Sequence, residues 1–243
     1  MVSAIIVAAG KGIRMNGKVR KQYLMLAGHP ILSRTLWVFN ACSAIDCIVV
    51  AVPEEDLDFC HERIITPLNL QKELRLVAGG AVRRDSVYNG ILAIEDKGGT
   101  VVIHDGVRPL VHPELLTACI EGVTETGACS LGLPAFETLK RVNSSGYIHA
   151  TLDRETIWMA QTPQAFEYSL IREAHEAGKG KGGLSTDDAL LVERLGKKVK
   201  MIRGSRFNIK ITTPEDLAIA EAMLQTSATE FPDSPFISPL ISS

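Results

Sequence analysis

Residues 4–24 of the chain read AIIVAAGKGIRMNGKVRKQYL, a short apolar run that passes into a loop of small and basic residues. The apolar run Ala4–Ala8 has the length and the unbroken hydrophobicity of a strand that is buried on both faces of a sheet. The alanines and glycines that follow allow backbone N–H groups to approach an anion closely. Because ligands of open α/β sheets bind at the carboxyl ends of the strands, this stretch predicts an α/β fold with an anion site at its edge.

The same order of strand and helix continues along most of the chain. We expect further strands at Cys47–Val52, Leu74–Ala78, Val101–His104, Cys129–Leu133 and Val199–Ile202. Helical patterns lie at Pro30–Cys42, Asp56–Ile65, Asp85–Glu95, Pro113–Thr126, Tyr168–Ala177, Asp187–Leu195 and Pro214–Leu224. This alternation is typical of a parallel sheet with helices on both sides and right-handed connections. We therefore predict a Rossmann-like three-layer α/β/α sandwich with a mainly parallel twisted sheet.

The alternation is interrupted at about residues 137–158. Two strand patterns, Thr138–Val142 and Tyr147–Leu152, flank the turn sequence NSSG at 143–146, which predicts a β-hairpin. A hairpin that projects from such a sheet has no core of its own, so we expect it to pack against a second copy of the chain. The predicted organisation is one domain over residues 1–225, whose projecting β-hairpin arm at about 137–158 serves dimerisation, and a flexible tail over residues 226–243.

Composition limits the partners and the compartment. The 243 residues carry 26 basic and 28 acidic side chains, a net charge of −2, and 46 % of them are hydrophobic. This balance does not favour a nucleic-acid or membrane-surface partner, and the apolar runs are too short to span a bilayer. The five cysteines are odd in number and lack CxxC spacing, which indicates reduced thiols. We expect a cytoplasmic protein whose local basic clusters bind small anions.

The basic loop differs from two better-known phosphate-binding loops. Met15 stands where the dinucleotide-binding fingerprint has its third glycine, which disfavours an NAD-dependent oxidoreductase. Residues 12–18 fit G-x-x-x-x-G-K, but Val19 replaces the hydroxyl residue that binds magnesium in a P-loop. A bound polyphosphate would relieve the repulsion among the basic residues of this loop, which are Lys11, Arg14, Lys18, Arg20 and Lys21. For the loop alone, an ordinary glycine-rich surface turn remains the alternative.

Three further stretches accompany this loop: VIHDGVRP at 102–109, TLDR at 151–154 with WMAQTPQ at 158–164, and NIKITTPEDL at 208–217. Together with AAGKGIRM at 8–15 and KQ at 21–22, they resemble the sugar-phosphate and polyol-phosphate nucleotidyltransferases. In this combination they resemble the 2-C-methyl-D-erythritol 4-phosphate cytidylyltransferase family of non-mevalonate isoprenoid biosynthesis, over about residues 3–225. The resemblance implies a homodimeric enzyme that transfers CMP from CTP to a polyol phosphate, with Mg²⁺ or another divalent cation as cofactor.

The resemblance also implies the roles of individual residues. Arg14 and Lys21 would be the catalytic pair that neutralises the phosphates, and Asp105 would bind the metal. The nucleotide would be held by Ala8, Ala9, Gly10, Gly12, Gly80, Ala81 and Ser86. The acceptor would be held by Arg108, Thr138, Arg154, Thr186 and Lys210, with Thr138 and Arg154 reaching across the dimer from the arm. From the residues alone, Asp105 could equally cap a turn and Ser86 could cap a helix.

Some alternatives and departures from the family pattern stay open. A ribitol 5-phosphate cytidylyltransferase shares the loop and metal motifs, and a non-catalytic nucleotide-binding regulator could use the same fold. The choice of CTP over UTP rests on resemblance alone. Arg20 stands where the family commonly has a proline, so we expect a less rigid loop with one additional positive charge. Gly106-Val107 replaces two alanines, and we expect no effect of this change on metal binding.

Overall fold

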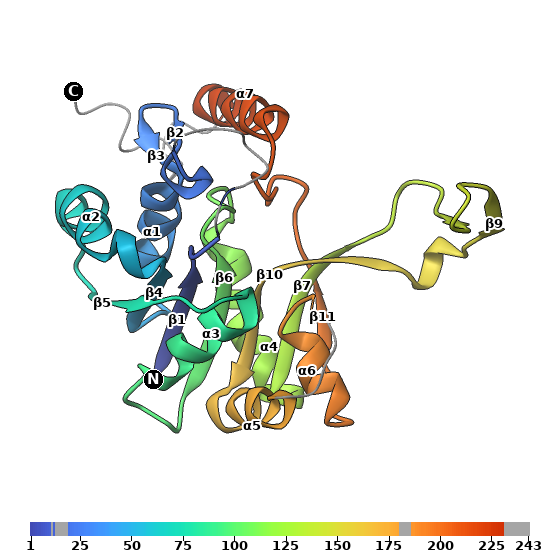
Figure 1. Ribbon diagram of the computed structural model, residues 1–243, viewed down its shortest axis with the longest axis horizontal. Helices are drawn as coiled ribbons and strands as arrows, with labels where there is room; N and C mark the ends of the chain where they lie inside the picture. Colours follow the sequence, from blue (N-terminus) through green and yellow to red (C-terminus); the bar gives the residue numbers. More distant parts are fainter. Residues whose placement is uncertain (11, 13–18, 180–185, 231–243) are drawn as a thin grey trace.

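The computed structural model describes residues 1–10, 12, 19–179 and 186–230. Its main sheet has seven strands in the order β11-β7-β10-β6-β1-β4-β5 (Figure 1). These strands are β1 (Val2–Val7), β4 (Cys47–Val52), β5 (Glu73–Ala78), β6 (Thr100–Asp105), β7 (Ala128–Pro134), β10 (Trp158–Glu167) and β11 (Lys200–Arg203). All neighbouring strands run parallel except β10, which is antiparallel to both β6 and β7. The predicted mainly parallel sheet is confirmed.

Helices cover both faces of this sheet. One face carries α1 (Ile31–Ala41), α2 (Leu57–Cys60) and α4 (Pro113–Thr126), and the other carries α3 (Arg83–Leu92), α5 (Tyr168–Gly178) and α6 (Ala189–Arg194). Successive strand side chains point to opposite faces, so that Ile6 packs into the first core and its neighbour Ile5 into the second. This arrangement is the predicted three-layer sandwich, with a buried core in each of its two interfaces.

Strand β10 in the middle of the sheet was not predicted. Its sequence WMAQTPQAFE is rich in polar residues and contains Pro163, which cannot donate a ladder hydrogen bond. The pairing with β7 shifts register between Ala160 and Gln164, and the proline lies in this irregular interval. The strand therefore continues through the proline by means of a local irregularity that a regular hydrophobic pattern does not indicate.

Two other elements differ from the expectation. The helix expected at Asp56–Ile65 is divided into a 3₁₀ turn η3 (Glu54–Asp56), α2, a π-helical segment η4 (His61–Ile65) and a 3₁₀ turn η5 (Thr66–Leu68). In the widened π segment Ile64 is buried and Ile65 packs against the same core. The last helix, α7 (Pro214–Glu230), extends beyond Gln225, so the first residues of the expected tail are helical. Residues 231–243 lie outside the described part of the chain.

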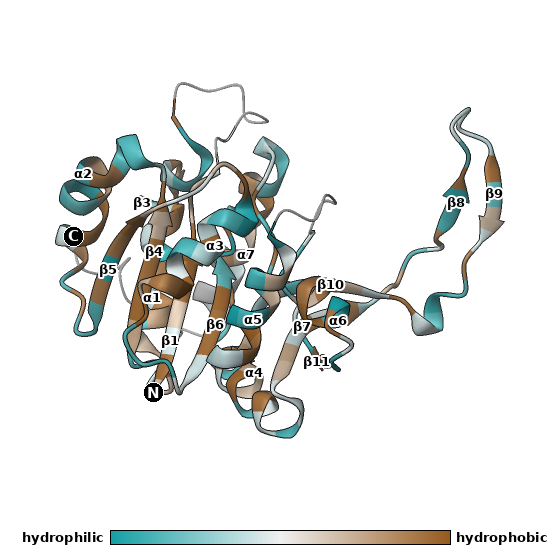
Figure 2. Cartoon of the chain, turned by 60° about the horizontal axis from the view of Figure 1, so that its bottom comes forward, coloured by the Kyte–Doolittle hydropathy of each residue, from teal (hydrophilic) through white to brown (hydrophobic). Residues whose placement is uncertain are grey.

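The predicted hairpin arm is present and projects away from the sandwich (Figure 1). It consists of β8 (Lys140–Val142) and β9 (Ile148–Thr151), which pair antiparallel. In the turn, Gly146 has a φ of 82°, and the Asn143 side chain accepts hydrogen bonds from the backbone N–H groups of Ser145 and Tyr147. Figure 2 shows hydrophobic colour along part of β9 in this arm. Large apolar side chains are exposed along and beside the arm, namely Phe136, Val142, Tyr147, Ile148, Trp158 and Met159. Dimerisation through the arm stays a prediction.

The cysteine side chains carry no disulfide. All five are free thiols, four of them buried, and the Sγ atoms of Cys119 and Cys129 lie 3.2 Å apart. Among the helices of the described residues, none combines the length and the apolarity that a bilayer span requires.

Candidate active site

A cleft of about 240 Å³ lies at the carboxyl ends of β1, β5 and β6. This is the edge at which the sequence predicts an anion site. Three loops form its walls, one after each strand, and Lys210 comes from the segment before α7. The lining residues are Val7, Ala8, Ala9, Gly10, Lys21, Gln22, Gly80, Ala81, Val82, Arg83, Ser86, Asp105, Val107 and Lys210. One chain thus brings together most of the residues predicted for the nucleotide, with Asp105 and Lys210 beside them.

The loop after β1 is held by the buried side chain of Gln22. Its Nε2 donates hydrogen bonds to the backbone oxygens of Ala8 (2.7 Å) and Gly10 (3.4 Å), so the end of the loop is tied to its beginning. Lys21 lines the cleft, and a Cβ atom built on Gly10 would lie 3.7 Å from Lys21 Cε. In the K-Q pair, the glutamine therefore fixes the loop and the lysine brings a charge into the cleft. Arg14, predicted to act with Lys21, lies outside the described residues.

Glycine is required in this loop at position 12. Gly12 has a φ of 63°, in the left-handed region that other residues rarely adopt. A Cβ atom there would also lie only 3.0 Å from the backbone nitrogen of Lys21. A larger residue at position 12 would therefore disturb the placement of Lys21.

Arg20 occupies the position at which the family pattern has a proline, and its charge does not lie in the cleft. Its φ of −66° is the value at which a proline ring would be fixed. Its guanidinium forms ion pairs with Glu55 and Asp56 of η3, the latter with Nε 2.7 Å from Oδ2. The additional positive charge expected in the loop is thus present but neutralised, and it ties the loop to η3.

The segment after β5 approaches the first loop closely. A Cβ atom on Gly79 would collide with the side chain of Ala9, so this position requires glycine. Ser86 Oγ accepts a hydrogen bond from the backbone nitrogen of Gly80 (3.0 Å) and lies within hydrogen-bond distance of Val82 O (3.2 Å). Ser86 therefore lies inside α3 and ties it to the preceding loop, and it is not the helix cap of the alternative interpretation, since α3 has no side-chain cap. Gly80, Ala81 and Ser86 nevertheless all line the cleft.

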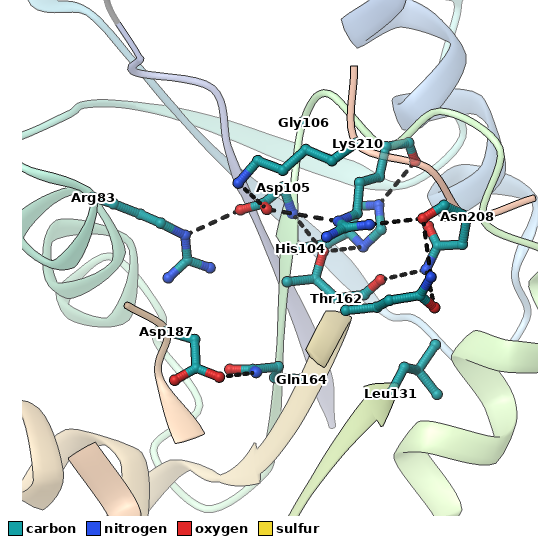
Figure 3. Close-up of polar contacts among 12 residues, drawn as sticks. Arg83, His104, Asp105, Gly106, Leu131, Thr162, Gln164, Asp187, Asn208 and Lys210 are labelled. Carbon is teal, nitrogen blue, oxygen red and sulfur yellow. Dashed lines mark hydrogen bonds and ion pairs between the residues drawn. The ribbon is translucent and has the colours of Figure 1, made fainter. Parts of the chain in front are cut away.

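Asp105, at the end of β6, is held between cations (Figure 3). Its Oδ1 lies 3.0 Å from Arg83 Nε, and its Oδ2 lies 2.7 Å from Lys210 Nζ and 3.7 Å from Arg108 Nε. The residue is only 6 % exposed, and burial alone would raise its pKa. The positive charges of Arg83, Lys210 and Arg108 instead hold the pKa of this carboxyl well below its usual range. Asp105 is therefore ionised at any physiological pH.

His104 supports the turn that presents Asp105. The Thr162 hydroxyl accepts a hydrogen bond from the Asp105 backbone nitrogen (3.1 Å), so its proton points to His104 Nδ1 at 3.1 Å. The imidazole proton is then on Nε2, which donates to the backbone oxygen of Arg108 (3.0 Å). Complete burial lowers the pKa of His104 to about 4. His104 is accordingly a neutral structural residue that joins both ends of the turn.

This neutral histidine makes the fold sensitive to acid. An unfolded histidine titrates near pH 6.5, so between about pH 6.5 and 4 the unfolded chain binds more protons than the folded one. The free energy of unfolding should therefore fall by about 2 kcal/mol from this group between pH 7.5 and 5. Urea denaturation of the parent protein and His104→Gln at both pH values checks this. The variant should lose less stability on acidification, and an equal loss in both proteins would contradict the assignment.

The remaining residues predicted for the acceptor lie in different places. Arg108 Nη1 donates to the backbone oxygen of Asn208 (2.7 Å), which joins the turn after β6 to the segment of Lys210. Arg108 is not among the residues that line the cleft. Thr186 is exposed just before α6. Thr138 and Arg154 belong to the arm, and Arg154 Nη1 donates to the backbone oxygen of Phe136 (2.7 Å).

The sequence did not predict three other residues that act around the cleft. Arg83 binds the carboxylate of Asp105, and Thr162 and Gln22 hold the backbone around it. Gln22 lies in the motif KQ at 21–22 and Thr162 in WMAQTPQ at 158–164, whereas Arg83 lies between the predicted nucleotide residues Ala81 and Ser86. A polar residue inside such a motif is the signal that could have identified them, although their partners are set only by the tertiary fold.

The donor set around Asp105 matches a metal that arrives with a nucleotide. Among the described residues, no group of three or more His, Cys, Asp or Glu side chains could hold a metal ion by itself. Mg²⁺ is commonly bound by one or two carboxylates together with substrate phosphates and water. A single ionised carboxylate at the edge of a phosphate-sized cleft fits that arrangement, with Asp105 as the protein ligand.

Comparisons with known proteins identify the family of the chain. The family model described as 2-C-methyl-D-erythritol 4-phosphate cytidylyltransferase matches residues 2–226. The chain is 46 % identical over 227 residues to a protein of that name from Geobacter metallireducens, covering 92 % of this chain and 97 % of the relative. It is 45 % identical over 231 residues to one from Geotalea uraniireducens, covering 94 % and 99 %.

Solved structures give the same result. The crystal structure of 4-diphosphocytidyl-2C-methyl-D-erythritol synthase from Anaerococcus prevotii superposes with a TM-score of 0.82 at 33 % identity, covering 92 % of this chain and 96 % of that one. The 2-C-methyl-D-erythritol 4-phosphate cytidylyltransferase from Thermus thermophilus superposes with a TM-score of 0.74 at 30 % identity, covering 91 % and 98 %. The chain therefore belongs to the 2-C-methyl-D-erythritol 4-phosphate cytidylyltransferase family of nucleotidyltransferases.

Proposed function

We propose that the protein transfers CMP from CTP to 2-C-methyl-D-erythritol 4-phosphate, giving 4-diphosphocytidyl-2-C-methyl-D-erythritol and pyrophosphate. The observation that carries the proposal is the placement of Asp105 in one cleft with Lys21 and Lys210. A carboxylate and two lysines beside a glycine-rich loop fit the binding of two phosphate-bearing substrates. Family membership supplies the identity of both substrates.

The reaction needs positioning and charge neutralisation more than covalent participation by the protein. A phosphate oxygen of the acceptor attacks the α-phosphorus of CTP, and the bond from that phosphorus to the bridging oxygen breaks as pyrophosphate leaves. The backbone of Ala8–Gly10 and Gly12 would cradle the triphosphate, and Gly80, Ala81 and Ser86 would contact the nucleoside. Lys21, with Arg14, would neutralise charge on the phosphates, and Lys210 would orient the acceptor phosphate.

Mg²⁺, or another divalent cation, would be held by Asp105 and the triphosphate, where it supplies positive charge to the reacting phosphates. The support for this part is the fit of the carboxylate described above. Arg108 and Thr186, which resemble acceptor-side positions of the family, would complete the acceptor site. We also propose that the protein is located in the cytoplasm, and its five free thiols support this compartment.

We further propose a homodimer that forms through the arm at about residues 137–158. Within the arm, β8 and β9 form a two-stranded sheet with exposed apolar side chains, and such a hairpin is marginally stable without a partner. The arm would bring Thr138 and Arg154 to the acceptor site of the second subunit. The domain division at residue 225 is part of the same proposal, with α7 closing the domain.

Arg154→Ala is expected to raise KM for the acceptor about tenfold or more, because a charge-assisted contact to its phosphate is lost. KM for CTP should change little, since the nucleotide contacts come from the sandwich. Steady-state kinetics with each substrate varied in turn measures both values. Arg141→Ala, which removes another exposed arginine of the same arm, is the matched control and should leave both values near those of the parent. A raised KM for CTP with an unchanged KM for the acceptor would refute the division into two sites.

Product analysis tests the function directly. The protein is incubated with CTP, Mg²⁺ and either 2-C-methyl-D-erythritol 4-phosphate or ribitol 5-phosphate, and CDP-polyol and pyrophosphate are quantified. Release of pyrophosphate only with the methylerythritol phosphate supports the proposal. A product with ribitol 5-phosphate alone would reassign the acceptor, and binding of CTP without turnover would indicate a nucleotide-binding regulator. A parallel reaction with UTP shows whether the nucleotide choice is correct.

A further inference from the structure

Arg83 connects the Asp105 carboxylate to a second acid deeper in the protein. Its Nε donates to Asp105 Oδ1 at 3.0 Å, and its Nη1 donates to Asp188 Oδ2 at 2.7 Å. The two acids are separated by 83 positions in the sequence, and this guanidinium bridges them. Its Nη2 atom is buried and has no hydrogen-bond partner among the described residues. Arg83 thus forms one ion pair at the cleft, with Asp105, and a second one away from the cleft, with Asp188.

Asp188 is the fixed end of this bridge. Its backbone nitrogen donates to Gln164 Oε1 (3.1 Å), which places it against the central strand β10. Its Oδ1 lies 3.2 Å from His175 Nε2 on α5, and both side chains are 1 % exposed. Burial alone would raise the pKa of Asp188, but the charge of Arg83 and the contact with His175 keep it below its usual value. Asp188 is therefore an ionised group in a rigid, buried setting.

Lys210, the other cation close to Asp105, is held less firmly than Arg83. Lys210 reaches Asp105 Oδ2 with a single flexible ammonium group, and its side chain is 38 % exposed, against 25 % for Arg83. Arginine has a planar fork that can hold two partners at once, whereas lysine is a point charge on a mobile stem. If a metal replaces one of these two cations at Asp105, we therefore expect Lys210 to leave and Arg83 to stay.

We propose that Asp188 is a positioning residue of the transfer reaction, acting on Asp105 through Arg83. The inference rests on the proposed function, because it assumes a metal–nucleotide complex at Asp105. With Asp188 in place, Arg83 occupies Oδ1 of Asp105 and leaves Oδ2 to Lys210 or to the metal. Without the Asp188 charge, the guanidinium is free to turn its fork onto both oxygens of Asp105 as a bidentate pair. It would then compete with the metal for the carboxylate.

The test is the binding of Mn²⁺ in the presence of a non-hydrolysable CTP analogue, followed by electron paramagnetic resonance. Asp188→Asn should raise the dissociation constant of Mn²⁺ about tenfold and lower kcat by a similar factor. The matched control is Asp187→Asn, which removes a charge from the neighbouring residue. Asp187 accepts hydrogen bonds from Gln164 Nε2 (2.8 Å) and the backbone nitrogen of Leu190 (3.2 Å). This control should bind Mn²⁺ like the parent, and a purely structural role of Asp188 would lower stability while leaving Mn²⁺ binding unchanged.

A double-mutant cycle distinguishes action through Arg83 from a direct effect. In an Arg83→Gln background, Asp188→Asn should add little to the change in Mn²⁺ binding, and additive effects would overturn the inference. If Asp188→Asn does not fold, Asp188→Ser also removes the charge and should shift Mn²⁺ binding in the same direction. No shift in that variant would also overturn the inference. Pyrophosphate release by the parent protein reports on the proposed function separately, so an active parent with parent-like Mn²⁺ binding in Asp188→Asn refutes this inference alone.

Discussion

Replacing Lys21 by alanine is expected to lower kcat by roughly two orders of magnitude or more. The lysine lines the cleft beside Gly10, where the proposed reaction would develop charge on the phosphates. Gln22, which ties the loop to Ala8 and Gly10, is unchanged in this variant, so the loop itself should persist. The loss therefore measures the charge and not the architecture of the loop.

A continuous assay of pyrophosphate release with both substrates saturating measures this effect. The matched control is Lys200→Ala, which removes a partly exposed lysine that pairs with Glu125 at the start of β11, at the end of the sheet opposite the cleft, and should change kcat by less than about tenfold. The family resemblance predicts a similar loss for Arg14→Ala as for Lys21→Ala. Near-normal turnover in both of those variants would refute the assignment of the catalytic pair.

Asp105→Asn is expected to lower turnover by at least about two orders of magnitude, because the proposed metal would lose its protein carboxylate. The same change should lower the free energy of unfolding by about 2–3 kcal/mol, since Arg83, Lys210 and Arg108 lose the charge that they share. Lys210 is partly exposed and can be hydrated, so the loss of stability should stay below that of breaking a fully buried pair.

Turnover across a series of Mg²⁺ concentrations and urea denaturation at pH 7.5 measure the two effects of this substitution. Asp96→Asn is the control, since it removes a partly exposed carboxylate near the opposite end of β6. That control should retain both the turnover and the urea midpoint of the parent. If Asp105→Asn kept the parent's turnover, the placement of the metal would be wrong.

Hydrophobic periodicity predicted most strands and helices because their apolar faces are what the layers bury. It failed at β10 for a physical reason. Gln161, Thr162 and Gln164 are polar and yet buried, and each is satisfied by a hydrogen bond within the site region. A pattern that treats buried positions as apolar cannot identify such a strand. Two of these side chains hold the turn of Asp105 and the start of α6, so the strand that was not predicted also supports the site.

The site was predictable where its residues follow one another along the chain. The loop with Lys21, the strand end at Asp105 and the segment of Lys210 all belong to contiguous motifs, and the structure places them around one cleft. Asp188 and Arg83 are 105 positions apart, and nothing in either local sequence indicates that they form an ion pair. Contacts of this kind arise from the packing of α3, α5 and α6 on one face of the sheet.

The ion pairs of Arg20 also matter for the choice of surface substitutions. Glu55 has a side chain that is 67 % exposed and belongs to none of the motifs that mark the site. It would therefore be chosen as a harmless position for mutations that improve solubility or crystal packing. Together with Asp56, it is the external anchor of the loop that presents Lys21. Charge reversal at this acidic pair would therefore be expected to displace Lys21, although neither residue lies in the cleft. The two positions should stay unchanged when the surface is redesigned.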